Sequence, residues 1–137
     1  LAAFIPVILG MGGNIATQSS TIIVRGMATG RVNIGGEIKL IFKEIKVGLI
    51  LGSLYGILLG VFAKFTLTSA PDNLGFVVGL SICASMVVAA TVGTIIPLIL
   101  RKLDIDPAIA TGPFVTTSID ILGVLFYFLI AGIFLQI

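Results

Sequence analysis

One acidic residue, Asp120, lies within the long apolar stretch that ends the chain, residues 107–137. An ionised carboxylate at the centre of a bilayer costs about 3 kcal/mol on insertion scales and far more in pure hydrocarbon. Membrane proteins keep such a group where it faces the protein interior or a water-filled path. Asp120 is therefore either the carboxylate of a transport path or a structural group that is protonated or hydrogen-bonded.

A stripe of four residues with the spacing i, i+3, i+4 and i+7 ends at this carboxylate: Pro113, Thr116, Thr117 and Asp120. On a helix these positions share one face, so they would line a polar path. We expect Pro113 to lie inside the helix and to remove one backbone hydrogen bond, with Gly112 adding flexibility before it. Carboxylate, hydroxyl and carbonyl oxygens suit hard cations such as Mg²⁺ or Ca²⁺. Since Mg²⁺ keeps several waters at one or two carboxylates, a second Asp120 from a symmetric partner would complete the site.

Asp106 opens the same stretch, directly before Pro107. Aspartate is a favoured helix cap and proline a favoured first helical residue. Asp106 is therefore either a cap or a carboxylate at the mouth of a cation path. At 1.5 Å per residue, Asp120 would lie roughly 20 Å along the helix from Asp106.

A second polar face occurs near the start of the chain. Asn14, Gln18 and Thr21 have the spacing i, i+4 and i+7, so they share one face of a helix. Amides and hydroxyls need partners within a membrane. This face either forms hydrogen bonds between helices or lines a pore or cavity that Asp120 also faces.

The composition is that of a membrane protein. Hydrophobic residues make up 58% of the 137 residues and charged residues 10%, whereas soluble domains have about 45–50% and 25%. We therefore predict an all-α, polytopic transmembrane bundle with four spans, at about residues 2–24, 47–65, 75–100 and 107–133. The net charge of +2 gives no support for nucleic-acid binding, and the lack of histidine excludes histidine-based catalysis and metal sites.

The connection after the first apolar segment is basic, because residues 25–46 hold five of the eight Lys and Arg residues. From Glu37 onward, apolar residues recur at helical spacing opposite the charges. We expect residues 31–46 to form an amphipathic connection with a short helix at the membrane surface, the alternative being a solvated linker with no further role. Residues 101–102 add two cations on the same side, and Lys64 is the one on the other side. Both basic connections are therefore predicted to be cytoplasmic.

A glycine recurs at every fourth residue of the second apolar segment: Gly48, Gly52, Gly56 and Gly60. Small residues at this spacing form a groove that lets another helix approach closely. We interpret the repeat as a packing face and give it no role in transport.

Two stretches of the sequence resemble the MgtE family of divalent-cation channels and transporters and its eukaryotic solute-carrier relatives. The first is Pro6-Val7-Ile8-Leu9-Gly10-Met11-Gly12-Gly13-Asn14, followed by Gln18-Ser19 and Arg25-Gly26. The second is Asp106-Pro107-Ala108 and Pro113-Phe114-Val115-Thr116-Thr117, followed by Asp120. Motifs of this length and spacing are specific, and the resemblance covers nearly the whole chain. One departure is Gly112, where some members of the family carry an asparagine.

The resemblance implies a homodimeric pore domain with five helices per subunit, of which residues 1–137 would lack the first. Its central metal site would fall on Asp120, with Thr116 beside it and Asp106 toward the cytoplasmic mouth. The pore would follow the dimer axis between the first and last apolar segments, with these lining residues: Gly10, Gly13, Asn14, Gln18, Gly112, Pro113 and Thr117.

The function implied by the resemblance is transport of hydrated Mg²⁺, without enzymatic activity, by a multi-pass protein of the plasma (inner) membrane. Mn²⁺, Co²⁺ and Ca²⁺ remain open as further ions. The partners would be an identical subunit, the lipid bilayer, and the first helix and cytoplasmic regulatory modules of the same chain. A secondary divalent-cation exchanger and a non-conducting structural membrane domain are the alternatives.

Overall fold

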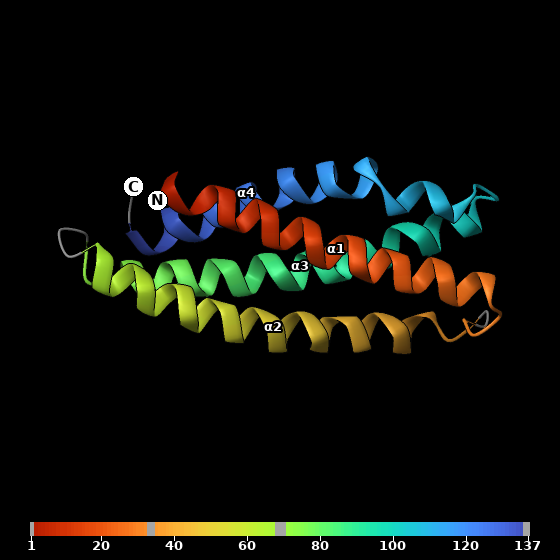
Figure 1. Cartoon of the computed structure of the whole chain (residues 1–137), viewed down its shortest axis with the longest axis horizontal. Coiled ribbons are helices and arrows are strands. Elements are labelled where there is room, and N and C mark those ends of the chain that lie inside the picture. Colours follow the sequence, from red (N-terminus) through yellow and green to blue (C-terminus); the bar gives the residue numbers. More distant parts are fainter. Residues whose placement is uncertain (1, 33–34, 68–70, 136–137) are drawn as a thin grey trace.

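The computed structural model describes residues 2–32, 35–67 and 71–135, which form a bundle of long helices lying side by side (Figure 1). With η for a 3-10 helix, the elements in chain order are η1 (Ala2–Phe4), α1 (Ile5–Ala28), α2 (Glu37–Thr66), α3 (Leu74–Lys102), η2 (Pro107–Thr111) and α4 (Pro113–Leu135). The four α-helices of the described residues are each long and apolar enough to cross a membrane. The predicted all-α bundle with four spans is therefore confirmed.

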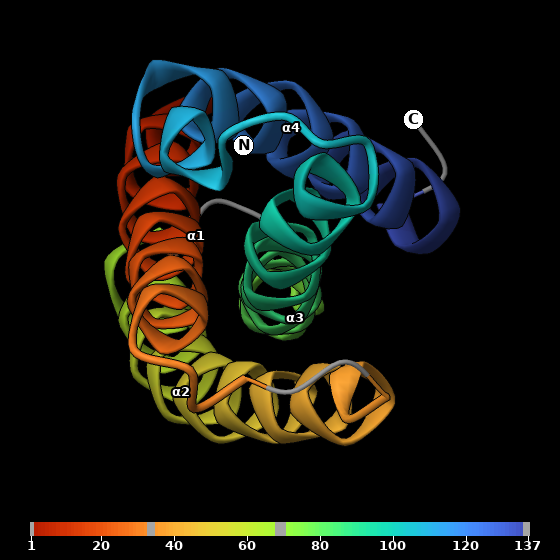
Figure 2. The ribbon, with the colours of Figure 1, turned by 90° about the vertical axis from the view of Figure 1, so that its right-hand side faces the viewer.

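α3 packs against each of the other three α-helices, and α1, α2 and α4 lie on three sides of it (Figure 2). Buried residues occur along almost its whole length, from Leu74 to Leu98. α2 and α4 instead expose large apolar side chains on their outer faces, including Ile50, Ile57 and Ile121. Apolar faces of this extent are suited to contact with lipid chains.

The glycine repeat of α2 packs against α3, as predicted, and all four glycines, Gly48, Gly52, Gly56 and Gly60, are buried. A Cβ atom added to Gly56 would lie 2.5 Å from the carbonyl oxygen of Gly79, and one on Gly60 would lie 2.6 Å from that of Gly75. The backbone of α2 is therefore in direct contact with the backbone of α3 at these glycines. Two antiparallel helices approach so closely only where neither carries a side chain.

α2 begins at Glu37 and continues without a break to Thr66. The helical part of the expected surface connection is thus the first turns of α2 and not a separate short helix, because no glycine or proline lies between Glu37 and Val47 to end it. Residues 33–34 of that connection lie outside the described residues. The 30 residues of α2 extend about 45 Å, which exceeds the roughly 30 Å of a bilayer's hydrocarbon core.

The last apolar stretch is divided into η2 and α4, where a single helix was expected. At Gly112 the backbone has φ −123° and ψ −148°, which are not helical angles, and α4 starts at Pro113. The prediction that Pro113 lies inside a helix was therefore wrong. Proline disfavours helical angles in the residue before it, whereas it is well suited to the first position of a helix.

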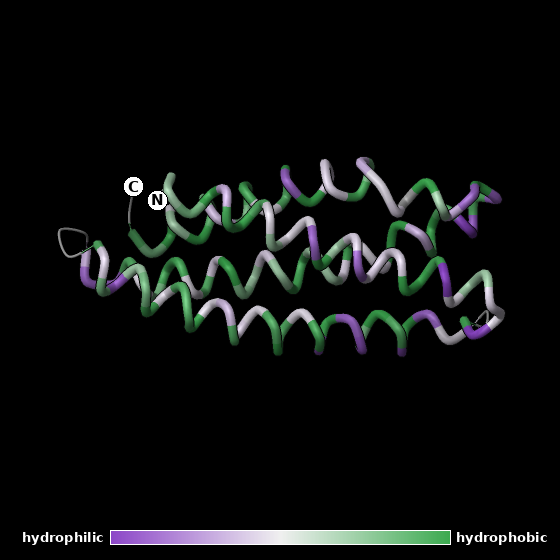
Figure 3. The backbone as a smooth tube through the Cα atoms, in the orientation of Figure 1, coloured by the Kyte–Doolittle hydropathy of each residue, from purple (hydrophilic) through white to green (hydrophobic). Residues whose placement is uncertain are grey.

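The two basic connections meet at one end of the bundle. Arg101 donates a hydrogen bond from Nη1 to the carbonyl oxygen of Val32 at 3.2 Å, and Lys102 Nζ lies 3.4 Å from Glu37 Oε1. Hydrophilic residues are concentrated at this end and also interrupt α1 and α4 along their lengths (Figure 3). The prediction that both connections lie on the same side is confirmed, while the cytoplasmic assignment of that side stays a prediction.

Candidate functional site: the polar faces of α1 and α4

α1 and α4 lie side by side in opposite directions. A Cβ atom added to Gly13 would lie 3.7 Å from the Thr116 methyl carbon Cγ2, and one on Gly12 would lie 3.1 Å from Ile119 Cγ2. The structure thus joins the two stretches that carried the resemblance, although about 100 residues separate them in the sequence.

Asp120 lies on α4, close to this contact. Its neighbour Ile119 faces Gly12 of α1, and Gly123, one turn further on, faces Ile8. Asp120 is therefore level with residues 8–12 of α1 and about one turn of helix from Asn14. The side chain is half-buried, and no residue that the structure describes makes a hydrogen bond or ion pair with its carboxylate. The structural alternative, a carboxylate held by hydrogen bonds, has no support within the described chain.

The polar face of α1 lines a groove of about 460 Å³, formed by Asn14, Thr17, Gln18, Thr21 and Ile22. Asn14, Gln18 and Thr21 are exposed, whereas Thr17 donates its hydroxyl to the Gly13 carbonyl oxygen at 2.8 Å. Within the described residues, the amides of Asn14 and Gln18 make no hydrogen bond to another helix. This arrangement favours the lining of a polar path over hydrogen bonding between helices of one chain.

The stripe on α4 is only partly arranged as predicted. Thr116 and Asp120 are half-buried, and Thr117 and Pro113 are exposed. The Thr116 hydroxyl donates to the Pro113 carbonyl oxygen at 3.1 Å, and its methyl group faces Gly13. Thr116 therefore contributes packing against α1, and its hydroxyl oxygen remains able to accept a hydrogen bond from water.

The three glycines that were predicted to line the pore, Gly10, Gly13 and Gly112, differ in their surroundings. A Cβ atom added to Gly10 or to Gly112 would meet no atom within 4 Å, whereas one on Gly13 would contact Thr116. Gly10 is exposed on the same face of α1 as Asn14, four residues further on. At Gly10 and Gly112 the glycine is thus not required for packing within one chain.

The structure does not place Asp106 next to Asp120. It precedes η2 at the basic end of the bundle, where its Oδ1 accepts a hydrogen bond from the Ala108 backbone N–H at 2.9 Å. The interpretation of Asp106 as a cap is confirmed by this geometry. Its side chain is exposed, so a role at the mouth of a path remains a prediction.

The structure also reveals a buried carboxylate that was not predicted, on α2. Glu44 is 4% exposed, and its Oε2 accepts a hydrogen bond from the Ser19 hydroxyl of α1 at 2.8 Å. From the sequence, Glu44 belongs to the basic connection predicted at the membrane surface, where a carboxylate is expected to be exposed. The pattern that could have revealed its burial is the four-residue spacing of Glu44, Gly48 and Gly52, which places Glu44 on the packing face of α2.

Carboxylates are dispersed in this fold. Among the described residues, no three acidic, histidine or cysteine side chains cluster as a set of metal ligands. Asp120 therefore belongs to no cluster of three or more such ligands within the described chain. What it offers is one carboxylate about one turn of helix from the open polar groove of α1, an arrangement suited to an ion that keeps most of its water.

A bundle of membrane-length helices that carries a carboxylate and an open polar face within those helices has the features of a polytopic membrane transport protein. The sequence profile of the MgtE family, described as divalent cation transporters, matches residues 5–130. The chain therefore belongs to the MgtE family. That description is of a transporter and not an enzyme, which supports the predicted lack of enzymatic activity.

Bacterial relatives match over nearly all of the chain. The magnesium transporter MgtE of Bacillus subtilis is 40% identical over 136 residues, which are 99% of this chain and 30% of that protein. The magnesium transporters MgtE of Enterococcus faecalis and Thermus thermophilus are each 38% identical over the same shares. The chain thus spans about 30% of the length of these relatives. Its membership of the MgtE family and its four membrane-length helices together identify the chain as a multi-pass integral membrane protein, located in the plasma membrane in bacteria.

Proposed function

We propose that this chain forms the ion-conducting part of a magnesium transporter, in which hydrated Mg²⁺ passes along the polar faces of α1 and α4. The observation that carries the proposal is the half-buried Asp120 on α4, about one turn of helix from Asn14 in the exposed groove of α1. The three relatives are named magnesium transporters. Oxygen atoms of carboxylates and amides are the groups with which Mg²⁺ and its bound waters interact most favourably.

A second copy of the chain is part of the proposal. The exposed side chains of Asn14, Gln18 and Thr117 are unsuited to lipid, because hydrocarbon offers them no hydrogen bonds. Pairing two copies across these faces would remove them from lipid. It would also enclose a water-filled path with two Asp120 carboxylates, whose combined charge balances that of one Mg²⁺ ion. Thr116 and Thr117 would lie along this path, with Asp106 near the basic end.

Replacement of Asp120 tests the ion path. Asp120→Asn keeps the shape of the side chain and removes its charge, so the hydrogen bonds from ion-bound water weaken. Hydrogen bonds to a charged group contribute about 1.5–3 kcal/mol, so we expect Mg²⁺ uptake to fall roughly 10- to 100-fold. Uptake would be measured in Mg²⁺-starved cells at matched amounts of protein in the membrane.

The matched control is Asp72→Asn, which removes an exposed carboxylate from the connection between α2 and α3, at the end of the bundle opposite the basic connections. This variant should leave uptake unchanged. Normal uptake by Asp120→Asn would overturn the proposed path. A strict requirement of Mg²⁺ uptake for a counter-ion would instead identify the protein as a secondary divalent-cation exchanger. The same assay with Mn²⁺, Co²⁺ and Ca²⁺ would establish the ion preference.

Cross-linking tests the second copy. In a Cys83→Ser background, Thr117→Cys places a thiol on the exposed stripe of α4, and we expect it to form a disulfide between two copies. Leu58→Cys, on the outer apolar face of α2 where Leu58 is 57% exposed, should not do so. Equal cross-linking at both positions would argue against pairing through α1 and α4.

A further inference from the structure

A basic pocket lies between the end of α1 and the first turns of α2. It has a volume of about 540 Å³, within the range of about 300–1,000 Å³ that is typical of small-molecule sites. Three cationic side chains line it, Arg25, Arg31 and Lys43, together with the apolar side chains of Ile22, Val32 and Leu40. The pocket therefore combines positive charge with an apolar wall.

The positive charge of this pocket is not balanced within the described residues. The four acidic side chains at this end of the bundle do not line the pocket: Glu37, Glu44, Asp104 and Asp106. Glu37 pairs with Lys102, and Glu44 accepts the hydrogen bond from Ser19. Within the described residues, Arg25, Arg31 and Lys43 form no ion pair. An anionic group from outside this part of the chain would complete the pocket.

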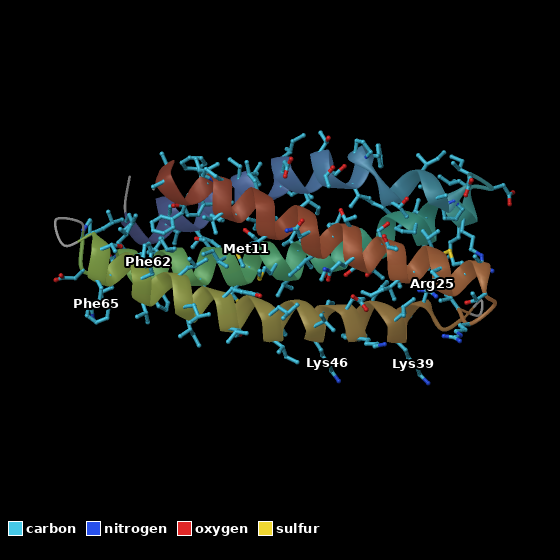
Figure 4. The ribbon with its side chains drawn as sticks, viewed as in Figure 1. Met11, Arg25, Lys39, Lys46, Phe62 and Phe65 are labelled. Atoms are coloured by element: carbon cyan, nitrogen blue, oxygen red, sulfur yellow. The ribbon has the colours of Figure 1, made fainter. Side chains whose placement is uncertain are left out.

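The pocket lies at the height of the lipid headgroups. Between Lys46 and Lys64 α2 carries no charge, and these residues are about 27 Å apart along the helix axis, close to the thickness of the hydrocarbon core. Lys43 lies about one turn outside Lys46. Exposed apolar side chains alternate with the lysines here, since Ile38 and Phe42 are 69% and 60% exposed. Lys39 and Lys46 point away from the bundle (Figure 4).

We propose that this pocket binds the phosphate of an anionic phospholipid, with Arg25, Arg31 and Lys43 around the headgroup and Ile22 and Leu40 against the start of its acyl chains. Basic pockets between transmembrane helices recognise anionic headgroups in this way. The apolar wall and the headgroup height favour a lipid over a soluble anion or an acidic peptide, neither of which needs an apolar surface. The inference is independent of the proposed ion path, because the three cationic residues do not line the polar groove of α1 and Ile22 is the one lining residue that the two share.

Native mass spectrometry of the purified protein in detergent, with equal amounts of phosphatidylglycerol and phosphatidylcholine, tests the proposal. We expect retained phosphatidylglycerol to exceed retained phosphatidylcholine. Arg25→Gln and Lys43→Gln should each lower the affinity for phosphatidylglycerol about fivefold, the usual effect of one basic residue near the membrane surface. Lys39→Gln is the matched control: it removes the same charge one turn away on α2 but outside the pocket, and should change the affinity less than twofold.

Equal retention of the two lipids would overturn the proposal, as would equal losses in Lys43→Gln and Lys39→Gln. Displacement of the lipid by millimolar inorganic phosphate would assign the pocket to a soluble phosphate instead. Should the variants fail to fold, a photoactivatable phosphatidylglycerol tests the unmodified protein. It should label peptides within residues 22–43, and labelling confined to other segments would contradict the site.

Discussion

The repeated glycines of α2 lie against the backbone of α3, whereas Gly12 and Gly13 of α1 lie against side chains of α4. At Gly56 an added Cβ atom would lie 2.5 Å from a carbonyl oxygen of the facing helix, and at Gly13 it would lie 3.7 Å from a methyl carbon. The first distance excludes a side chain, and the second is an ordinary van der Waals contact. Glycines therefore permit backbone contact in one interface and contact with side chains in the other.

The two interfaces also differ in polarity. The outer faces beside the α2/α3 interface are apolar, as at Ile50 and Ile57. Beside the α1/α4 interface lie Asn14, Gln18 and the half-buried Asp120. Under the proposed function, α2 and α3 support the bundle and α1 and α4 carry the ion path. Substitutions should therefore separate stability from transport.

The largest loss of stability is expected for Gly56→Val. The added side chain would overlap the backbone of α3 at Gly79, which no change of side-chain rotamer can relieve. Overpacking typically costs about 1–3 kcal/mol and sometimes more, and because the overlap here is with backbone we expect a loss above about 3 kcal/mol. The thermal midpoint and the yield of folded protein in detergent should both fall. A Gly56→Val protein with a normal midpoint would show that α2 and α3 can separate without cost.

A smaller loss is expected at the hydrogen bond between Ser19 of α1 and Glu44 of α2. Glu44→Ala removes the acceptor of a buried hydrogen bond to a charged group, so stability should fall by about 1.5–3 kcal/mol. Glu44→Gln keeps an acceptor oxygen and should lose less. A double-mutant cycle with Ser19→Ala measures the pairwise energy. Additive effects of the two substitutions on the midpoint would show that the hydrogen bond contributes nothing.

The smallest effect on stability is expected on the polar face of α1. Gly10→Ala adds a methyl group that meets no atom within 4 Å in one chain, and alanine also favours a helix by about 1 kcal/mol over glycine. The midpoint should stay equal or rise slightly. If Gly10 lines the path, uptake of Mg²⁺ should nevertheless change, as measured beside Gly13→Ala. Unchanged uptake in both variants would remove these glycines from the pore lining.

Much of the fold could be predicted from the sequence because its causes are local. The length and hydropathy of each apolar segment determine whether it spans a membrane, and the glycine repeat of α2 identifies a packing face whatever the partner helix. The motifs around Asn14 and Asp120 were sufficient to recognise the family. The start of α4 could also have been predicted, since the angles of Gly112 follow from the proline after it.

Other features were decided only by the tertiary structure. Whether Glu44 is a surface charge or a buried acceptor depends on Ser19, which belongs to another helix and lies 25 positions away in the sequence. The openness of the groove at Asn14 and Gln18 likewise depends on which helices pack against α1, since only α1 residues line it. Burial is a property of neighbouring surfaces and not of one segment. The sequence therefore determined which helices form and which residues are polar, and the packing of the helices decided which of those residues are enclosed.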